Sequence, residues 1–334
     1  MAGTRVGASA PAAAEAALKC SASGGNAIDC TLAGFFAAAG ATAGVLLAPL
    51  AAIVGGVGMR ARCIDGRAIQ GGSNLPRPRG FRDEDEIPDA AHVAVSRSLP
   101  ALALLQAYGA SRTLLALSKF GERAAKGSPQ RAAFIAHIGR RGVATFRSEA
   151  ISSALLGVAG QGQGGLLSET DLLDARPGDD PLSFQPVADG IEVVTAAVLR
   201  GESTLPARPA QVIVAADPQG RVCALSYLPA LSGLPVEELG VSLPRDGEPV
   251  RRGTPRITPG TPRPAHFPLA MLRRREDGWF AALGVEGGPA WTHAQITEAH
   301  RPALNDMLQS LRGESDRAAV AATVQRQLTD SVSL

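Results

Sequence analysis

The stretch Gly24-Gly25-Asn26-Ala27-Ile28-Asp29 introduces a segment, residues 30–59, that contains no charged residue. Asn26 is a suitable N-cap, and Asp29 places a carboxylate in the first helical turn, where the helix dipole favours it. The uncharged segment is rich in Ala and Gly and is broken by Pro49. It therefore predicts a buried helix followed by a loop, and not a membrane span.

The composition restricts the class of protein. The chain has 334 residues, of which 45% are hydrophobic, so it can bury a substantial core. Its 33 Lys and Arg residues against 31 Asp and Glu residues give a net charge of only +2, which argues against a nucleic-acid partner. The four cysteines have no spacing typical of a metal site, and residues 1–17 lack the apolar core of a secretory signal. We expect a cytoplasmic protein with reduced thiols and with no metal or other cofactor.

Residue patterns along the chain predict helices first and hairpins later. Helices are expected at residues 12–19, from 26 onward, and at 99–108, 112–117, 130–137, 146–158, 168 onward, 191–199 and 318–328. Strands are expected from residue 64 onward and at 211–216, 222–227, 267–272 and 279–285, with surface loops at 74–89 and 244–268 and a linker at 177–181. We expect a mainly helical half (1–176), a strand-rich half (177–312) and a tail (313–334), which together form one compact domain with an α/β sandwich.

Several motifs resemble those of the gamma-glutamyltransferase (gamma-glutamyltranspeptidase) family. They are the opening stretch at residues 24–29, Gly55-Gly56-Val57-Gly58, Asp65-Gly66-Arg67-Ala68, and the segment Gly164-Gly165-Leu166-Leu167-Ser168-Glu169-Thr170-Asp171-Leu172. The resemblance covers residues 5–176 and continues more faintly through residues 213–220 and 279–288. It implies the N-terminal-nucleophile hydrolase fold, an α+β sandwich of four layers, αββα. In that family the precursor cuts itself, and the freed threonine attacks gamma-glutamyl amides such as glutathione.

The chain departs from the family at the reacting group. The family's Thr-Thr-His segment aligns with Ala210-Gln211-Val212, so an alanine stands at the nucleophile position. Alanine can neither cut the chain nor attack an amide. The family's paired serines have no counterpart, because no serine occurs at residues 251–270, and the substrate-holding Asn falls near Ala230. The resemblance therefore implies a shortened and degenerate relative.

Parts of the family's binding site remain. The resemblance places Arg67 where the substrate α-carboxylate is held and Gly287-Gly288 where the oxyanion is stabilised, and it leaves Asp246 and Glu248 to face an amine. Each feature has a plainer alternative, since Arg67 can pair with Asp65 and a Gly-Gly pair can be a simple turn. The glycines at residues 55–58 can either cradle an anion or serve packing.

We therefore expect a non-catalytic pseudoenzyme that acts as a binding or scaffold protein. Its ligand would be a gamma-glutamyl compound or an amino acid, and its partner another protein, such as an intact family member, in a hetero-oligomer that shields apolar helix surface at Phe35 and Phe36. The alternative is an amidase, a gamma-glutamyl hydrolase or transferase that acts through a displaced nucleophile, Thr204 or Cys223.

Overall fold

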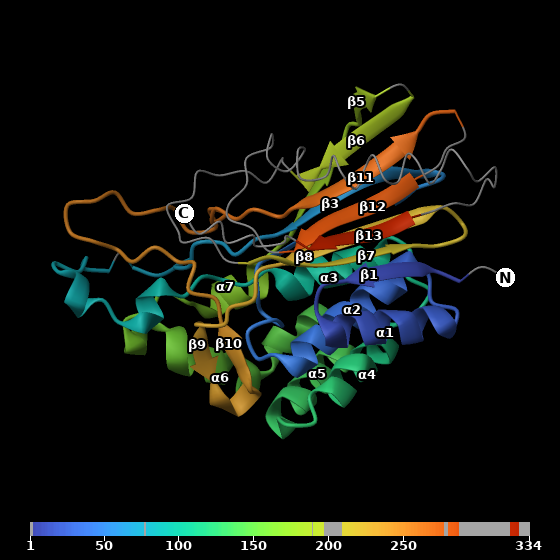
Figure 1. Ribbon diagram of the computed structural model, residues 1–334. Helices are drawn as coiled ribbons and strands as arrows, with labels where there is room; N and C mark the ends of the chain where they lie inside the picture. Colours follow the sequence, from blue (N-terminus) through green and yellow to red (C-terminus); the bar gives the residue numbers. More distant parts are fainter. Residues whose placement is uncertain are drawn as a thin grey trace, which may run out of the picture.

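The structure is a computed structural model that describes residues 3–76, 78–188, 190–196, 209–276, 280–286 and 321–326. Seven α-helices of this part lie on one side of two stacked sheets (Figure 1). The helices are α1 (Pro11–Ala22), α2 (Ala27–Ala41), α3 (Ser98–Ala107), α4 (Leu114–Ala124), α5 (Pro129–Arg141), α6 (Glu149–Ala159) and α7 (Glu169–Asp174).

The first sheet is antiparallel and combines strands from distant parts of the chain. Its order is β1 (Arg5–Ala8), β7 (Gln211–Ala216), β8 (Arg221–Tyr227), β2 (Leu50–Gly56), β3 (Met59–Gly66) and β4 (Gly178–Pro181). Ile53 of β2 pairs with Cys63 of β3 and with Ala224 of β8. The two halves of the sequence therefore share one sheet.

The second sheet packs on the face of the first sheet that is turned away from the helices (Figure 1). Its order is β13 (Ala321–Arg326), β12 (Phe280–Glu286), β11 (Leu269–Arg274), β6 (Ile191–Thr195) and β5 (Gln185–Ala188). A separate small hairpin joins β9 (Leu234–Val236) to β10 (Val241–Leu243).

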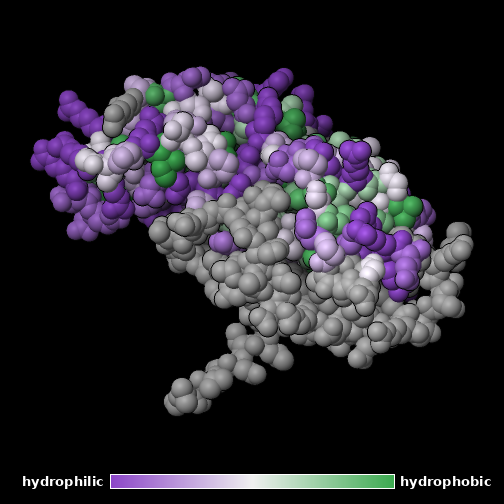
Figure 2. Space-filling view, turned by 90° about the horizontal axis from the view of Figure 1, so that it is seen from above, coloured by the Kyte–Doolittle hydropathy of each residue, from purple (hydrophilic) through white to green (hydrophobic). Residues whose placement is uncertain are grey.

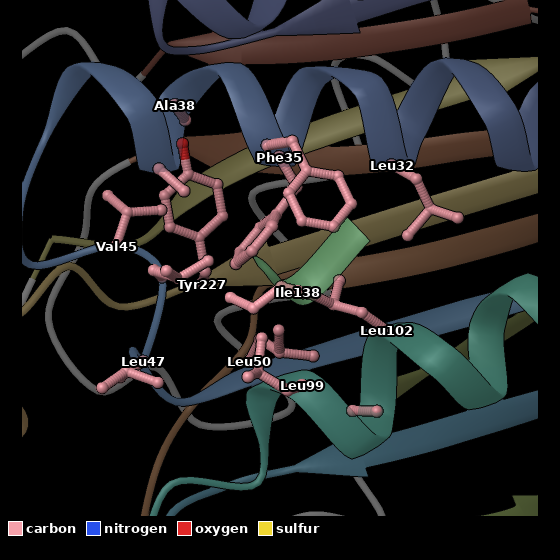
Figure 3. Packing of buried hydrophobic residues seen from close by; sticks show 14 of the residues in the cluster. Leu32, Phe35, Ala38, Val45, Leu47, Leu50, Leu99, Leu102, Ile138 and Tyr227 are labelled. Carbon is pink, nitrogen blue, oxygen red and sulfur yellow. The ribbon is translucent and has the colours of Figure 1, made fainter. Parts of the chain in front are cut away.

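Successive side chains of the central strands point to opposite faces of the first sheet, so the buried residues form two cores, one on each face. On β7, Ile213 faces the helices while Val212 and Val214 face the second sheet. On the helix side, Phe35 of α2 stacks edge-to-face on Tyr227 of β8, with ring centroids 5.4 Å apart (Figure 3). This contact fixes α2 across the first sheet.

The start of α2 confirms the predicted cap. The Asn26 side chain accepts a hydrogen bond from the Asp29 backbone N–H at 3.0 Å, and the Asp29 carboxylate accepts one from the Asn26 N–H at 3.0 Å. The same carboxylate accepts a bond from the backbone N–H of Arg112 at 3.0 Å. The capping box thus also ties α2 to the loop before α4.

Most of the predicted elements are confirmed within a few residues. They include all the helices predicted up to residue 174 and the two hairpins β7–β8 and β11–β12. The turn at residues 217–220 also has the expected chemistry, since Gly220 has a φ of 80° and its N–H donates to the Asp217 carbonyl at 2.9 Å.

Four predicted elements are wrong, and each is a strand in the structure. Residues 50–56, predicted as loop, form β2, and residues 178–181, predicted as linker, form β4. Within the helices predicted at 191–199 and 318–328, the described residues form β6 and β13. Long-range pairing decides each case, because β4 and β6 lie at sheet positions beside β3 and β11. Such pairing overrides a short local pattern.

The predicted α/β sandwich is confirmed as a mixed helix and sheet fold. The described residues supply three of the expected layers, one of helices and two of sheet. Phe35 and Phe36 are buried by the chain itself, so the expectation that they form a surface for a partner is wrong. Within the described part of the chain, no helix is long and apolar enough to cross a membrane.

Two predicted surface loops lie at one end of the molecule. Exposed charged residues gather on the first loop at Arg82, Asp83, Glu84 and Asp85, and the second loop returns beside it, with Phe81 N–H donating to Val250 O at 2.9 Å. This end is predominantly hydrophilic (Figure 2).

Candidate ligand site at the Ala210 edge

The position expected to hold the nucleophile lies at one edge of the first sheet. Ala210 immediately precedes β7 and is buried in the core between the two sheets. The register aligns Gln211 with Tyr227, Leu50 and Gly66 on the successive strands β8, β2 and β3. The next residues outward are therefore Ala210, Leu228, Pro49 and Arg67, and we call this side the Ala210 edge.

The register brings Arg67 and Ala210 to the same edge although they are far apart in sequence. Three strand spacings separate β7 from β3, which corresponds to roughly 14 Å. A small molecule held by Arg67 could span that distance.

The second sheet reaches the same edge through β12. Gly284 packs closely on Val212, since a Cβ added at Gly284 would lie 2.9 Å from Val212 Cβ. Phe280, at the other end of β12, contacts Phe184 near the β2–β3 turn. β12 therefore runs antiparallel to β7 and ends, at Glu286, toward the Ala210 edge. Gly287 and Gly288, the predicted oxyanion glycines, lie outside the described residues.

Arg67 belongs to a buried ion cluster centred on Asp65. Its Nε and Nη2 donate to Asp65 Oδ1 and Oδ2 at 3.1 and 3.0 Å, and Arg97 Nη2 lies 2.8 Å from Asp65 Oδ2. The side chains of Asp65, Arg67 and Arg97 are only 6%, 12% and 7% exposed. The expected pairing of Arg67 with Asp65 is therefore present, but in the interior and not on the surface.

Electrostatics in this cluster favour the charged carboxylate. Burial opposes ionisation of Asp65, but the hydrogen bond from Arg67 and the charges of Arg97 and Arg67 outweigh it, so the pKa of Asp65 lies below its usual value. Burial lowers the pKa of Arg97. The Asp65 carboxylate therefore lies in contact with two guanidinium groups.

Arg97 is a member of the cluster that the sequence analysis missed. Its Nε donates to the Arg67 carbonyl at 2.6 Å and its Nη1 to the Arg176 carbonyl at 3.1 Å. It therefore fixes the backbone that carries Arg67. The available signal is that Arg97 is the only charged residue in the sequence from 93 to 111 and directly precedes α3.

Asp246 and Glu248 lie on the loop that runs beside residues 68–70, just beyond Arg67. Gln70 exchanges two hydrogen bonds with the Glu248 backbone at 3.0 and 2.9 Å, and Arg263 Nε donates to the Asp246 carbonyl at 2.7 Å. The Glu248 carboxylate lies 3.4 Å from Arg263 Nη2. The structure thus places both acidic residues near the Ala210 edge, with Glu248 directed toward Arg263.

The structure describes one of the two residues predicted as replacement nucleophiles, Cys223, and does not describe the other, Thr204. Cys223 is fully buried on the helix face of β8, away from the space between the sheets, and burial raises its pKa to about 12. Its thiol is therefore protonated at neutral pH. Thr204 lies outside the described residues.

A further hydroxyl, not identified from sequence, faces the core between the sheets. Ser226 pairs with Val212 and with Ala51, and alternation with Val222 and Ala224 turns its side chain toward the second sheet. Its Oγ is buried and makes no hydrogen bond with any residue that the structure describes. On this face it is the diagonal neighbour of Ala210 across the β7–β8 pair.

The glycine-rich turn at residues 55–58 lies at the opposite edge of the sheet from Arg67. It joins β2 to β3, where Gly56 and Gly58 adopt φ values of 142° and 74°. The turn lines an open pocket of about 670 Å³ together with Phe184 and Phe280. This turn and Arg67 therefore do not form one site.

Comparison with known proteins identifies the fold but no family. The sequence matches no family model and no curated protein. By structure, the chain is similar to LmbA2991, with a TM-score of 0.63 and 13% identity over 96% of this chain and 92% of that one. It is also similar to cephalosporin acylase from Bacillus halodurans, with a TM-score of 0.62 and 14% identity over 82% and 75% of the two chains.

A third similar structure is gamma-glutamyltranspeptidase from Helicobacter pylori, with a TM-score of 0.47 and 16% identity over 56% and 68% of the two chains. The likeness to LmbA2991 and to the cephalosporin acylase shows that the chain adopts the N-terminal-nucleophile hydrolase fold. At these identities the likeness concerns the fold alone, because one fold hosts many activities.

Proposed function

We propose that this chain is a non-catalytic protein with the N-terminal-nucleophile hydrolase fold, which binds a ligand and does not hydrolyse an amide. The observation that carries the proposal is Ala210 at the start of β7. Catalysis by this fold needs a hydroxyl or thiol at that position, with its own α-amine as base. A methyl group provides neither nucleophile nor proton acceptor.

The ligand that fits the Ala210 edge is an amino acid or a gamma-glutamyl compound with a free carboxylate. Arg67 and Arg97 place two guanidinium groups at this edge. A guanidinium group recognises a carboxylate through paired hydrogen bonds. Asp246 and Glu248, on the neighbouring loop, supply the negative charge that an α-amine would require.

Calorimetric titration with L-glutamate and with a gamma-glutamyl dipeptide tests this proposal. We expect binding that weakens at least tenfold in Arg67→Gln, with retention of the native circular dichroism spectrum. The matched control is Arg60→Ala, which removes an exposed arginine at the other end of β3 and should leave binding unchanged. Equal affinity in the wild-type and R67Q proteins would refute the assignment of Arg67.

Hydrolysis is tested separately with a chromogenic gamma-glutamyl anilide. We expect no release of the aniline above the buffer rate. Sustained turnover by the purified chain would refute the non-catalytic assignment.

A protein partner is the second part of the proposal. Members of the gamma-glutamyltransferase family, which the sequence motifs resemble, work as two interlocked subunits. A chain without a nucleophile can serve as the non-catalytic member of such a pair. Sedimentation of the purified chain with and without an intact gamma-glutamyltransferase tests this form. A stable hetero-oligomer supports it, and independent sedimentation of the two proteins contradicts it.

A further inference from the structure

Two cysteine thiols lie together in the hairpin of α1 and α2. Cys20 is in the last turn of α1, Cys30 is in the first turn of α2, and both are fully buried. The two helices form one of the most extensive helix contacts of the molecule (Figure 1). Neither cysteine takes part in the candidate ligand site.

Gly25 brings the two sulfur atoms together. A Cβ added at Gly25 would lie 2.5 Å from Cys20 Sγ, while the Cys30 thiol donates to the Gly25 carbonyl at 3.6 Å. The two thiols also lie close enough to shift each other's pKa. Both sulfur atoms therefore lie beside Gly25, in the turn between the two helices.

The other two cysteines have different surroundings. Cys63 faces the second sheet, and Cys223 lies against Thr31 on the helix face of β8. They provide internal controls, because they are also fully buried but lie on strands of the first sheet.

The two adjacent thiols are not equivalent. The neighbouring Cys30 thiol and the charge of Arg112 lower the pKa of Cys20 against the opposing effect of burial, whereas the Cys20 thiol and burial raise the pKa of Cys30. Cys20 is thus the better thiolate, and the thiolate is the form that reacts with oxidants.

We propose that Cys20 and Cys30 form an oxidisable dithiol, which a peroxide converts into a disulfide that links α1 to α2. The Cys20 thiolate attacks one peroxide oxygen and the O–O bond breaks. With hydrogen peroxide the departing hydroxide takes up a proton, which leaves a sulfenic acid and water. Cys30 Sγ then attacks the Cys20 sulfur, the S–O bond breaks, and the hydroxyl group leaves as a second water with the thiol proton.

Access to the pair comes through the hairpin turn. Ser23 and Gly24 are exposed and immediately follow the last turn of α1. Opening of this turn would admit peroxide, so we expect oxidation over minutes to hours that accelerates in mild denaturant.

Peptide mapping of the full chain after peroxide treatment tests the proposal. No Lys or Arg lies between Cys20 and Arg60, so trypsin releases both cysteines in one peptide, residues 20–60, that contains no other cysteine. We expect this peptide to lose two hydrogen atoms and to resist alkylation unless it is reduced. The peptide that contains Cys63 should remain fully alkylated.

Variants provide the second measurement. Cys20→Ala and Cys30→Ala should each abolish the mass loss, while the Cys63→Ala, Cys223→Ala double variant should retain it. Oxidation of the wild-type chain should also raise Tm by about 3–6 °C, because a cross-link restricts the unfolded chain.

Two results would overturn the proposal, and both come from the wild-type chain, so neither depends on the folding of a variant. One is a peptide 20–60 that takes up two alkyl groups after peroxide treatment of the folded protein. The other is a peptide that gains oxygen atoms without forming the cross-link.

Discussion

At the residue scale, Asp65 determines the charge state of the candidate site. Its Oδ2 atom lies 3.0 Å from Arg67 Nη2 and 2.8 Å from Arg97 Nη2. Removal of its charge would take a buried charged partner away from both guanidinium groups. We expect Asp65→Asn to lower the free energy of unfolding by about 3 kcal/mol at pH 7. Guanidinium unfolding measures the change, and Asp180→Asn, on the exposed strand β4, is the control.

The same residue predicts a pH dependence. The pKa of Asp65 is lower in the folded chain than its ordinary value of 3.8, so the unfolded chain binds this proton first as the pH falls. The contribution of Asp65 is therefore complete above its unfolded pKa and is lost as the pH falls through its folded pKa. Asp65→Asn should show a smaller loss of stability between pH 6 and pH 3 than the wild type, if both values are measured in the same denaturant series. If the free energy of unfolding depended on pH identically in both proteins, the result would contradict this role of Asp65.

Ser226 tests the energetic cost of a buried polar group, because its hydroxyl makes no hydrogen bond with any described residue. A buried polar group without a partner destabilises the fold. We expect Ser226→Ala to leave stability unchanged or to raise the free energy of unfolding by about 1 kcal/mol. A loss of more than about 1 kcal/mol would show that the hydroxyl has a structural partner.

At the element scale, α2 and α4 approach each other through two glycines. A Cβ added at Gly121 would lie 2.6 Å from the Phe36 carbonyl, and one added at Gly40 would lie 2.1 Å from the Gly121 carbonyl. Gly121→Ala should therefore lower the free energy of unfolding by about 2 kcal/mol or more, because the helices must separate. Gly157→Ala on α6 is the matched control, since no atom lies within 4 Å of its added Cβ. It should stabilise the chain by up to about 1 kcal/mol, as expected for Ala over Gly in a helix.

The elements also show how much of the fold could be predicted from sequence. Helices with local signals were found, as at Asn26 and Ser168, where capping boxes form as the residue types indicate. The four strands that the sequence predicts as a loop, a linker or a helix lack such signals. Gly178–Pro181, for example, is a strand because β3 offers an edge beside it, with Asp65 paired to Gly178. Its own sequence, with Gly, Asp and Pro, indicates a turn.

The residues of the candidate site also divide into those with a local sequence signal and those that only distant contacts bring together. Arg67 was found because its motif resembles that of a family, and its short-range pairing with Asp65 was foreseen as the alternative. Arg97 was not found, because its role depends on contacts with Arg67 and Arg176, which are 30 and 79 residues away in sequence. Only the folded arrangement brings these residues together.

At the scale of the whole molecule, the chain combines the N-terminal-nucleophile hydrolase fold with an alanine at the start of β7. Ala210 is enclosed between two sheets, in register with the edge that carries Arg67. We propose that this fold works here without self-cleavage and without a nucleophile.

Intact-mass spectrometry of the purified chain, after long incubation at neutral pH, tests whether the chain cuts itself. We expect one species near 34.2 kDa, the mass of the uncut chain. Two fragments, the second of which begins with a Ser, Thr or Cys between residues 199 and 214, would reveal a displaced nucleophile and contradict the non-catalytic assignment.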